Sequence, residues 1–395
     1  MTRLLLPAIW LLVLIAGLPQ LSETVYSPSL PEIADALNTS ESMVEYTLTI
    51  YLFGFAIGTL FWGKLSDQWG RKSSVLGGLI IFILGCIGCY FSSSIEMLML
   101  SRLVQAFGGS IGSVLGQAIC RDAFLGPDLG KVYSVIGSAL AVFPAIGPLV
   151  GGLIAQFSDW SIIFLFLLAC AVILTLLVGF YLPETHHVSL RKSVSIIDVA
   201  LNLLKDRRVM GFALIVAACN GICFSYFAEG SFFLIKNLGL SPSQYGASFM
   251  LIAASTMLGG MLSKKLHAHL ISKTIMEYGL MLIALFGVFF SVFTLMYVNI
   301  FNLSNYWMIG VTILSQMGIM FGVCMATSNA LALALVDYKH CIGTASSLFG
   351  FFYYALISLF TLGMGLLHNG TLLPMPLYFM GLAFFMLLVR KLLIH

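Results

Sequence analysis

The topology of this chain is set by a short charged segment, Gly63-Lys64-Leu65-Ser66-Asp67-Gln68-Trp69-Gly70-Arg71-Lys72. An apolar run lies on each side of this segment, at about 44–63 and 74–92. Each run is close to the roughly 20 residues that a helix needs to cross the hydrocarbon core of a membrane. Loops that carry Lys and Arg stay on the cytoplasmic side. The segment therefore predicts two membrane-spanning helices joined by a cytoplasmic turn.

Composition extends this prediction to the whole chain. Of the 395 residues, 60% are hydrophobic and 9% are charged, and the mean hydropathy is +1.02. A soluble domain carries about a quarter charged residues, so this chain needs a bilayer as the solvent for its apolar surface. No basic stripe of the kind that binds nucleic acid lies outside the short loops. The cysteines, Cys86 and Cys89 included, fall almost entirely in apolar runs, and we interpret them as ordinary buried thiols.

The apolar runs predict an all-α integral membrane protein with about twelve transmembrane helices. The first run resembles a signal peptide, but its length and the lack of a small-residue cleavage site favour a retained helix. The predicted spans are 4–26, 44–63, 74–92, 96–119, 130–155, 160–181, 209–235, 244–262, 275–297, 306–333, 343–366 and 373–393.

The positions of Lys and Arg predict the orientation in the membrane. With the N-terminus inside, every Lys and Arg except Arg102 and Lys236 falls on the inner side. Both termini are therefore expected to be cytoplasmic. The outer segment after the first span is acidic instead, and contains Glu32, Asp35, Glu41 and Glu45.

The longest inner connection divides the chain into two halves. We expect a six-helix bundle over 1–185, a cytoplasmic linker over 186–208 and a second six-helix bundle over 209–395. The linker segment 198–204 is apolar on one side, which predicts a short amphipathic helix on the inner membrane surface. Two helical halves joined in this way are typical of rocking transporters with a site near the membrane midplane.

The charged segment resembles the G-x-L-x-D-x-x-G-R-[KR] loop signature of the major facilitator superfamily. Its glycines permit a tight turn and close helix packing. Its aspartate is placed to pair with a cation or a helix N-terminus. In that family the loop latches the two halves in one state, and the resemblance implies this role for Gly63, Asp67, Gly70, Arg71 and Lys72.

Two further motifs are similar to ones in this superfamily. Arg102 and Gln105 in the fourth span match the R-x-x-Q-G pattern except that Ala106 replaces its glycine. The fifth span resembles the G-P-x-x-G-G motif of exporters and antiporters, although the upstream glycines of the full motif are missing. The residues implied by this antiporter motif are Pro144, Gly147, Pro148, Gly151 and Gly152.

Other stretches are similar to the Bcr/CflA drug-resistance branch, a group of twelve-helix drug–proton antiporters. The segment Val25-Tyr-Ser-Pro-Ser-Leu-Pro-Glu-Ile-Ala34 resembles the D-M-Y-L-P-A-L-P segment of that branch. The segment Ser328-Asn-Ala-Leu-Ala332, with 343–348 after it, matches the pattern of helices ten and eleven. This chain has Thr24 where the branch usually has Asp, with Glu23 next to it.

Proton exchange needs a carboxyl group at membrane depth, where loss of water favours the neutral form. Glu23 and Glu229 are the acids that fall well inside predicted spans. Glu23 shares a helical face with Gln20 and Ser27, which fits either a cavity wall or contact with outer water near Pro28. We expect Glu23 to bind the exchanged proton, and Glu229 to recognise cargo or to bind a second proton.

The substrate cavity is expected to be largely apolar and aromatic, with a few polar groups at membrane depth. Arg102 can face this cavity or a partner, or extend toward the outer interface. Met and aromatic side chains suit amphipathic ligands, but they also serve as plain packing groups. The cavity residues that we predict are Gln20, Tyr26, Arg102, Gln105, Gln117, Tyr226, Gln316, Met320, Asn329 and Tyr353.

The sequence therefore predicts a proton-coupled exporter of small amphipathic or drug-like molecules in the bacterial inner membrane. Export of an endogenous metabolite such as a siderophore or nucleoside, or uptake by symport, are the alternatives. No nucleotide-binding loop, metal cluster or nucleophile elbow suggests an enzyme. We expect protons as the coupling ion with no cofactor or metal. The expected partners are the lipid bilayer and a small-molecule substrate, without nucleic acid, and the expected state is a monomer.

Overall fold

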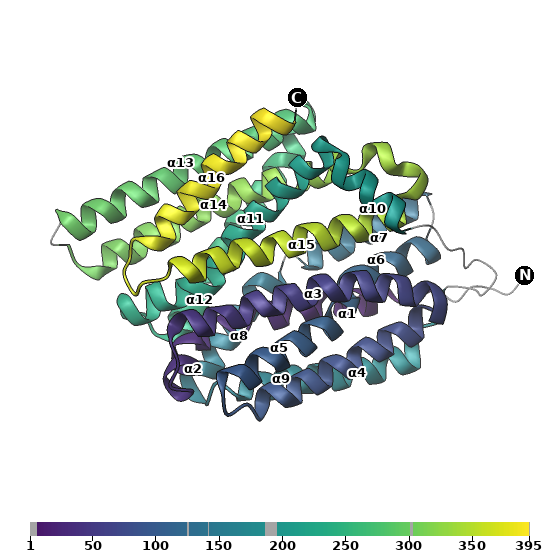
Figure 1. Cartoon of the computed structure of the whole chain (residues 1–395), viewed down its shortest axis with the longest axis horizontal. Helices are drawn as coiled ribbons and strands as arrows, with labels where there is room; N and C mark the ends of the chain where they lie inside the picture. Colours follow the sequence, from purple (N-terminus) through teal and green to yellow (C-terminus); the bar gives the residue numbers. More distant parts are fainter. Residues whose placement is uncertain (1–5, 125, 141, 186–195, 301–302, 395) are drawn as a thin grey trace, which may run out of the picture.

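The protein is built from two helical bundles that lie side by side (Figure 1). The computed structural model describes residues 6–124, 126–140, 142–185, 196–300 and 303–394. The first bundle holds α1 (Ile9–Thr24), η1 (Ser27–Ser29), α2 (Leu30–Ala36), α3 (Glu41–Trp69), α4 (Arg71–Tyr90), α5 (Ile95–Gly109), α6 (Ile111–Ala123), α7 (Gly126–Leu140), α8 (Phe143–Phe157) and α9 (Ile162–Tyr181). After α10 (Ile196–Lys205), the second bundle holds α11 (Arg207–Ser231), η3 (Phe232–Asn237), α12 (Pro242–Leu266), α13 (Ser272–Asn299), α14 (Asn305–Ala334), η4 (Val336–Cys341), α15 (Ile342–Leu367) and α16 (Pro374–Leu393).

The lengths of the helices fit a membrane. Within the described residues, 11 helical segments are long and apolar enough to cross a bilayer. Each coincides with one predicted span. The remaining predicted span, 130–155, corresponds to two helices of 15 residues, α7 and α8. Pro144 stands in the first turn of α8, where its missing N–H costs no helical hydrogen bond.

The first span is longer than the sequence predicted. The predicted span stops at residue 26, before Pro28, but Pro28 lies in the short turn η1, and α2 continues to Ala36. Proline is tolerated there because a first-turn residue donates no helical hydrogen bond. The span therefore runs over Ile9–Ala36. Glu23 lies almost in the middle of this span, and not near its outer end.

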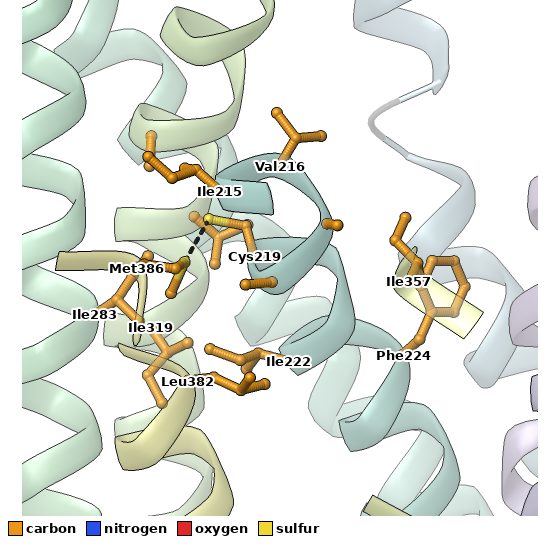
Figure 2. Packing of buried hydrophobic residues seen from close by; sticks show 14 of the residues in the cluster. Ile215, Val216, Cys219, Ile222, Phe224, Ile283, Ile319, Ile357, Leu382 and Met386 are labelled. Carbon is orange, nitrogen blue, oxygen red and sulfur yellow. Dashed lines mark hydrogen bonds between the residues drawn. The ribbon is translucent and has the colours of Figure 1, made fainter. Parts of the chain in front are cut away.

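Each bundle has its own apolar core. Figure 2 shows part of the second core, where α11 packs through Ile215, Cys219 and Ile222. The Cys219 thiol lies 3.4 Å from the Met386 sulfur of α16. Seven cysteines of the described residues are free thiols, and Cys86 and Cys89 are fully buried.

The linker helix α10 packs against the second bundle. Val199 and Leu203 are buried in that core, whereas Leu201 and Leu204 are exposed. Asp206 caps the start of α11 by accepting hydrogen bonds from the backbone N–H groups of Arg208 and Val209. Residues 186–195 of the predicted linker lie outside the described part of the chain.

Candidate functional site

A cavity of about 1060 Å³ lies between the two bundles. The first bundle contributes α1, α6 and α7 to its wall, and the second contributes α14 and α15. Four of the predicted site residues line it, namely Gln20, Glu23, Gln117 and Tyr353. Phe55 of α3 and Tyr354 add aromatic rings, whose centroids lie 4.6 Å apart with their planes tilted by 43°. The cavity therefore combines apolar walls with a carboxyl group and two amides.

Glu23 is the acidic residue in this wall. Its residue is 5% exposed, and its Oε1 atom is buried without a hydrogen-bond partner. The Oε1 atom of Gln20, one helical turn earlier, is also buried and unpartnered. Buried polar atoms normally find partners. Both residues line the cavity, and each has a side-chain oxygen that no protein group satisfies.

A second cavity of about 350 Å³ lies mainly within the second bundle, between α11, α12 and α14. It is lined by the predicted residues Tyr226, Gln316 and Met320. Tyr226 and Gln316 are each 1% exposed. The Tyr226 hydroxyl and both amide atoms of Gln316 have no hydrogen-bond partner. This cavity suits an apolar group that carries a hydrogen-bonding atom.

Three predicted cavity residues lie together inside the first bundle instead. The buried Arg102 guanidinium stacks on the rings of Tyr26 and Tyr51, at 4.6 and 4.1 Å from their centroids. Arg102 Nη1 donates to Gln105 Oε1 at 2.7 Å. Arg102 is fully buried and does not extend to the outer interface, and aromatic faces stabilise its charge.

Asn329 joins two helices of the second bundle. Its side-chain amide donates to Ser263 Oγ of α12 at 3.0 Å and to the Met325 carbonyl at 2.8 Å. Hydrogen bonds of this kind hold helices together in an apolar medium. The structure places Asn329 in helix packing.

Glu229 lies at a different place from Glu23. It is 1% exposed, and its Oε2 atom lies 2.7 Å from Nδ1 of His368, just after α15. His368 also contacts Glu41 and Glu45 of the first bundle. We name these four residues the outer cluster. Sequence reasoning missed it, and it placed Glu45 in an outer loop, which is wrong because Glu45 lies in α3 and is 1% exposed.

The predicted antiporter motif forms a tight seam between the bundles. A Cβ atom on Gly152 would collide with the Pro242 carbonyl oxygen of α12, and one on Gly246 with the Pro148 carbonyl oxygen. Within the first bundle, Gly147 and Gly151 pack equally closely against Thr24 and Val25 at the end of α1. Small residues allow this close backbone approach.

The two bundles are closed at the outer side. Besides the seam and the outer cluster, Ser27 donates to the Phe227 carbonyl and bonds the Tyr245 hydroxyl, the latter at 2.9 Å. The central cavity extends the other way, to Cys120 and Tyr133 near the basic inner loops. A neighbouring cavity includes Arg121 of that inner end. The structure is thus in an inward-facing state.

The charged segment of the inner side is organised around Arg71. Its side chain donates to Asp67 Oδ1 at 2.6 Å, Asp122 Oδ2 at 2.7 Å and Ser66 Oγ at 2.7 Å. Gly70 adopts a φ of +98°, which side chains rarely tolerate. These partners belong to the first bundle. Gly63 faces the other bundle, where a Cβ would lie 3.5 Å from Ser347 Oγ.

Comparison with known proteins agrees with this architecture. Residues 12–361 match the Major Facilitator Superfamily. The chain is 34% identical to an uncharacterized transporter of Rickettsia felis, over 92% of this chain and 90% of that protein. It is 29% identical to a bicyclomycin resistance protein homolog of Haemophilus influenzae, over 85% of this chain and 83% of that protein.

A solved structure shares the fold. The xylose transporter XylE from E. coli, in a partially occluded inward-open conformation, superposes with a TM-score of 0.73. The match covers 98% of each chain at 14% sequence identity. The family is one of transporters and not of enzymes, and this chain is a multi-pass membrane protein. With its paired helical bundles, its inner-loop signature and this match over most of its length, the chain belongs to the major facilitator superfamily.

Proposed function

We propose that this protein is a proton-coupled exporter of small amphipathic or drug-like molecules, and that it works by alternating access across the bacterial inner membrane. The observation that carries this proposal is the position of Glu23. It is a buried, incompletely paired acid at mid-depth of the membrane, in the wall of a cavity between the two bundles. A carboxyl group there binds either a proton or a cationic part of the cargo, but not both at once.

The cavities support an amphipathic cargo. The central cavity offers Glu23, Gln20 and Gln117 to a polar or cationic group. The second cavity offers aromatic and Met side chains, with Tyr226 and Gln316 as hydrogen-bonding groups. A mostly apolar pocket with a few polar groups selects ligands by their shape and by the apolar surface that they bury. The bicyclomycin resistance homolog among the relatives supports export of such molecules.

The exchange follows from competition at Glu23. In the inward-facing state, cargo enters from the cytoplasm and displaces the proton on Glu23. After the bundles rock, a proton from the outer side displaces the cargo. Because a proton and cargo cannot occupy the carboxyl group together, each cargo molecule that moves outward is exchanged for a proton that moves inward. The proton gradient therefore drives export.

The test is Glu23→Gln, which keeps the shape of the side chain but cannot exchange a proton. In inverted vesicles with an imposed pH gradient, we expect accumulation of a fluorescent amphipathic cation to fall at least tenfold. The melting temperature in detergent is expected to stay close to that of the parent protein. Glu96→Gln, at an exposed acid of α5, is the matched control and keeps transport. Normal gradient-driven accumulation by Glu23→Gln would reject the proposal.

A further inference from the structure

The outer cluster is separate from the cavity that contains Glu23. Glu41 and Glu45 come from the first turns of α3 in the first bundle, and Glu229 and His368 come from the second bundle. His368 links them, with Nε2 at 2.9 Å from Glu41 Oε2, and Nδ1 at 2.7 Å from Glu229 Oε2. Nδ1 also lies 3.7 Å from Glu45 Oε1. The cluster therefore exists only while the outer ends of the bundles are together.

The outer cluster has more acids than cations. Lys236 pairs with Glu41, at the exposed edge of the cluster. If His368 Nε2–H donates to Glu41, Nδ1 is left facing Glu229, either as a donor or as an acceptor. In both cases a proton must lie between Nδ1 and Glu229, because 2.7 Å is a hydrogen-bond distance. That contact requires either a protonated imidazole or a protonated carboxyl group.

Glu45 gives a second reason for the outer cluster to bind a proton. It is 1% exposed, and neither of its carboxyl oxygens has a hydrogen-bond donor. Gly365 of α15 lies against this carboxyl group, where even a Cβ atom would come within 3.1 Å of Oε2. The Glu229 carboxyl group is also next to it, and two buried negative charges side by side are strongly unfavourable. When the outer ends of the bundles close, the Glu45 carboxyl group is therefore more stable protonated than charged.

Other titratable groups nearby do not supply the missing charge. On α2, Glu32 accepts a hydrogen bond from the Trp160 backbone at 3.0 Å, and Asp35 is exposed. The Tyr245 hydroxyl of α12 bonds Ser27, and the Tyr46 ring packs on Gly365. Among the described residues outside the cluster, Lys236 is the cation that contacts it, through Glu41.

We propose that Glu45, Glu229 and His368 form a second proton-binding site, whose occupation from the outer side closes the outer gate. Closure brings acids of both bundles together, so the closed gate binds protons more tightly than the open gate. Protonation therefore favours closure at low pH, and the closed gate is lost as pH rises. Each linked proton changes the ratio of closed to open gate by up to about tenfold per pH unit. The site goes beyond the proposed exchange at Glu23 and does not depend on it.

The experiment measures the gate directly. Spin labels are placed at Ala36→Cys and Asn369→Cys, which are exposed outer positions on opposite bundles, in a functional variant without native cysteines. Distance distributions are recorded by electron–electron resonance between pH 5 and pH 9, with a chelator present. We expect the short-distance, closed population to fall at least tenfold relative to the open one as pH rises.

Variants assign that response to the cluster. Glu45→Gln and Glu229→Gln mimic the protonated acids, so we expect a gate that stays closed at high pH. Asp35→Asn, an exposed acid at the same end, is the matched control and keeps the parent response. The series is repeated with Glu23→Gln, which removes the cavity acid but is expected to leave the gate response unchanged. The transport assay therefore tests the exchange at Glu23, and the spin-label distances test the gate site separately.

Two results would overturn the proposal. One is a closed-gate population that does not depend on pH in the parent protein, or a pH dependence in Glu45→Gln and Glu229→Gln that is as large as in the parent. The other is a response that disappears in chelator and returns with Zn²⁺. The ligand atoms of Glu45, Glu229 and His368 lie within 4.8 Å of one another, so that second result would identify a metal site instead.

Discussion

At the inner end of the first bundle, one residue, Arg71, links three other chain segments. Arg71 joins the end of α3, through Asp67, to the end of α6, through Asp122. Its backbone N–H also donates to Glu184 Oε1, beyond α9, at 2.8 Å. The planar group donates in several directions at once, which an ammonium group on a flexible stem cannot reproduce. Arg71 thus stabilises the turn that its glycine neighbour makes possible.

We predict that Arg71→Ala destabilises the folded protein. It removes a charge-assisted hydrogen bond from the partly buried Asp122, and such bonds contribute roughly 1.5–3 kcal/mol. Thermal unfolding in detergent measures the effect. Lys72→Ala is the matched control, because Lys72 makes an exposed bond to the Gly179 carbonyl, and we expect a much smaller change. Equal melting temperatures for Arg71→Ala and the parent would contradict this role.

The candidate site was predicted from the sequence only as far as local spacing reaches. Glu23 and Gln20 were placed on one face by helical periodicity, and both line the cavity. Glu229 was recognised as a membrane-depth acid, but its partner His368 is 139 residues away. Arg102 was identified as unusual in a span, but the sequence does not show that two tyrosine rings cover it. Contacts between distant segments depend on packing, which periodicity does not encode.

At the scale of helices, the sequence predicted most spans because apolar length is a strong signal in a membrane. Its errors came from proline. Pro28 was interpreted as the end of the first helix, although a proline in a first turn is compatible with a continuing span. The span 130–155 contains Pro144, and it is made of α7 and α8.

At the scale of helices, we predict the effect of a bulky side chain in the seam between α8 and α12. Gly152→Val places a branched side chain against the Pro242 carbonyl oxygen of the other bundle. Overpacking of this kind costs roughly 1–3 kcal/mol, so we expect the outer side to open. A membrane-impermeant thiol reagent added outside should then label Ser27→Cys about tenfold faster. Gly381→Val has open space around its Cβ position and is the control. Unchanged labelling in Gly152→Val would show that the seam does not hold the gate.

At the scale of the whole molecule, alternating access requires the outer contacts to break. Gln156 of α8 and Ser243 of α12 contact each other across the bundles, with Ser243 Oγ 3.4 Å from Gln156 Oε1. We predict that a disulfide between Gln156→Cys and Ser243→Cys traps the inward-facing state. Transport in inverted vesicles should stop, while cargo binding from the inner side persists.

A reducing agent should restore transport in the cross-linked protein. Each single cysteine variant, treated with the same oxidant, is the control and should keep transport. Full transport by the cross-linked pair would mean that the outer ends of α8 and α12 need not separate during the cycle.

The helix α3 runs from the outer end of the first bundle to its inner end. The 29 residues of α3 have no interior proline and span about 43 Å, from Glu41 in the outer cluster to Trp69 at the inner loop. Near the middle, Gly54 and Gly58 press against the Leu103 and Phe107 carbonyl oxygens of α5, where a Cβ on either would lie at 2.7 Å. Because α3 packs this closely on α5, we expect the two helices to move together as one rigid part of the first bundle. If the bundles rock, an inward movement of the outer end of α3 is then accompanied by an outward movement of its inner end.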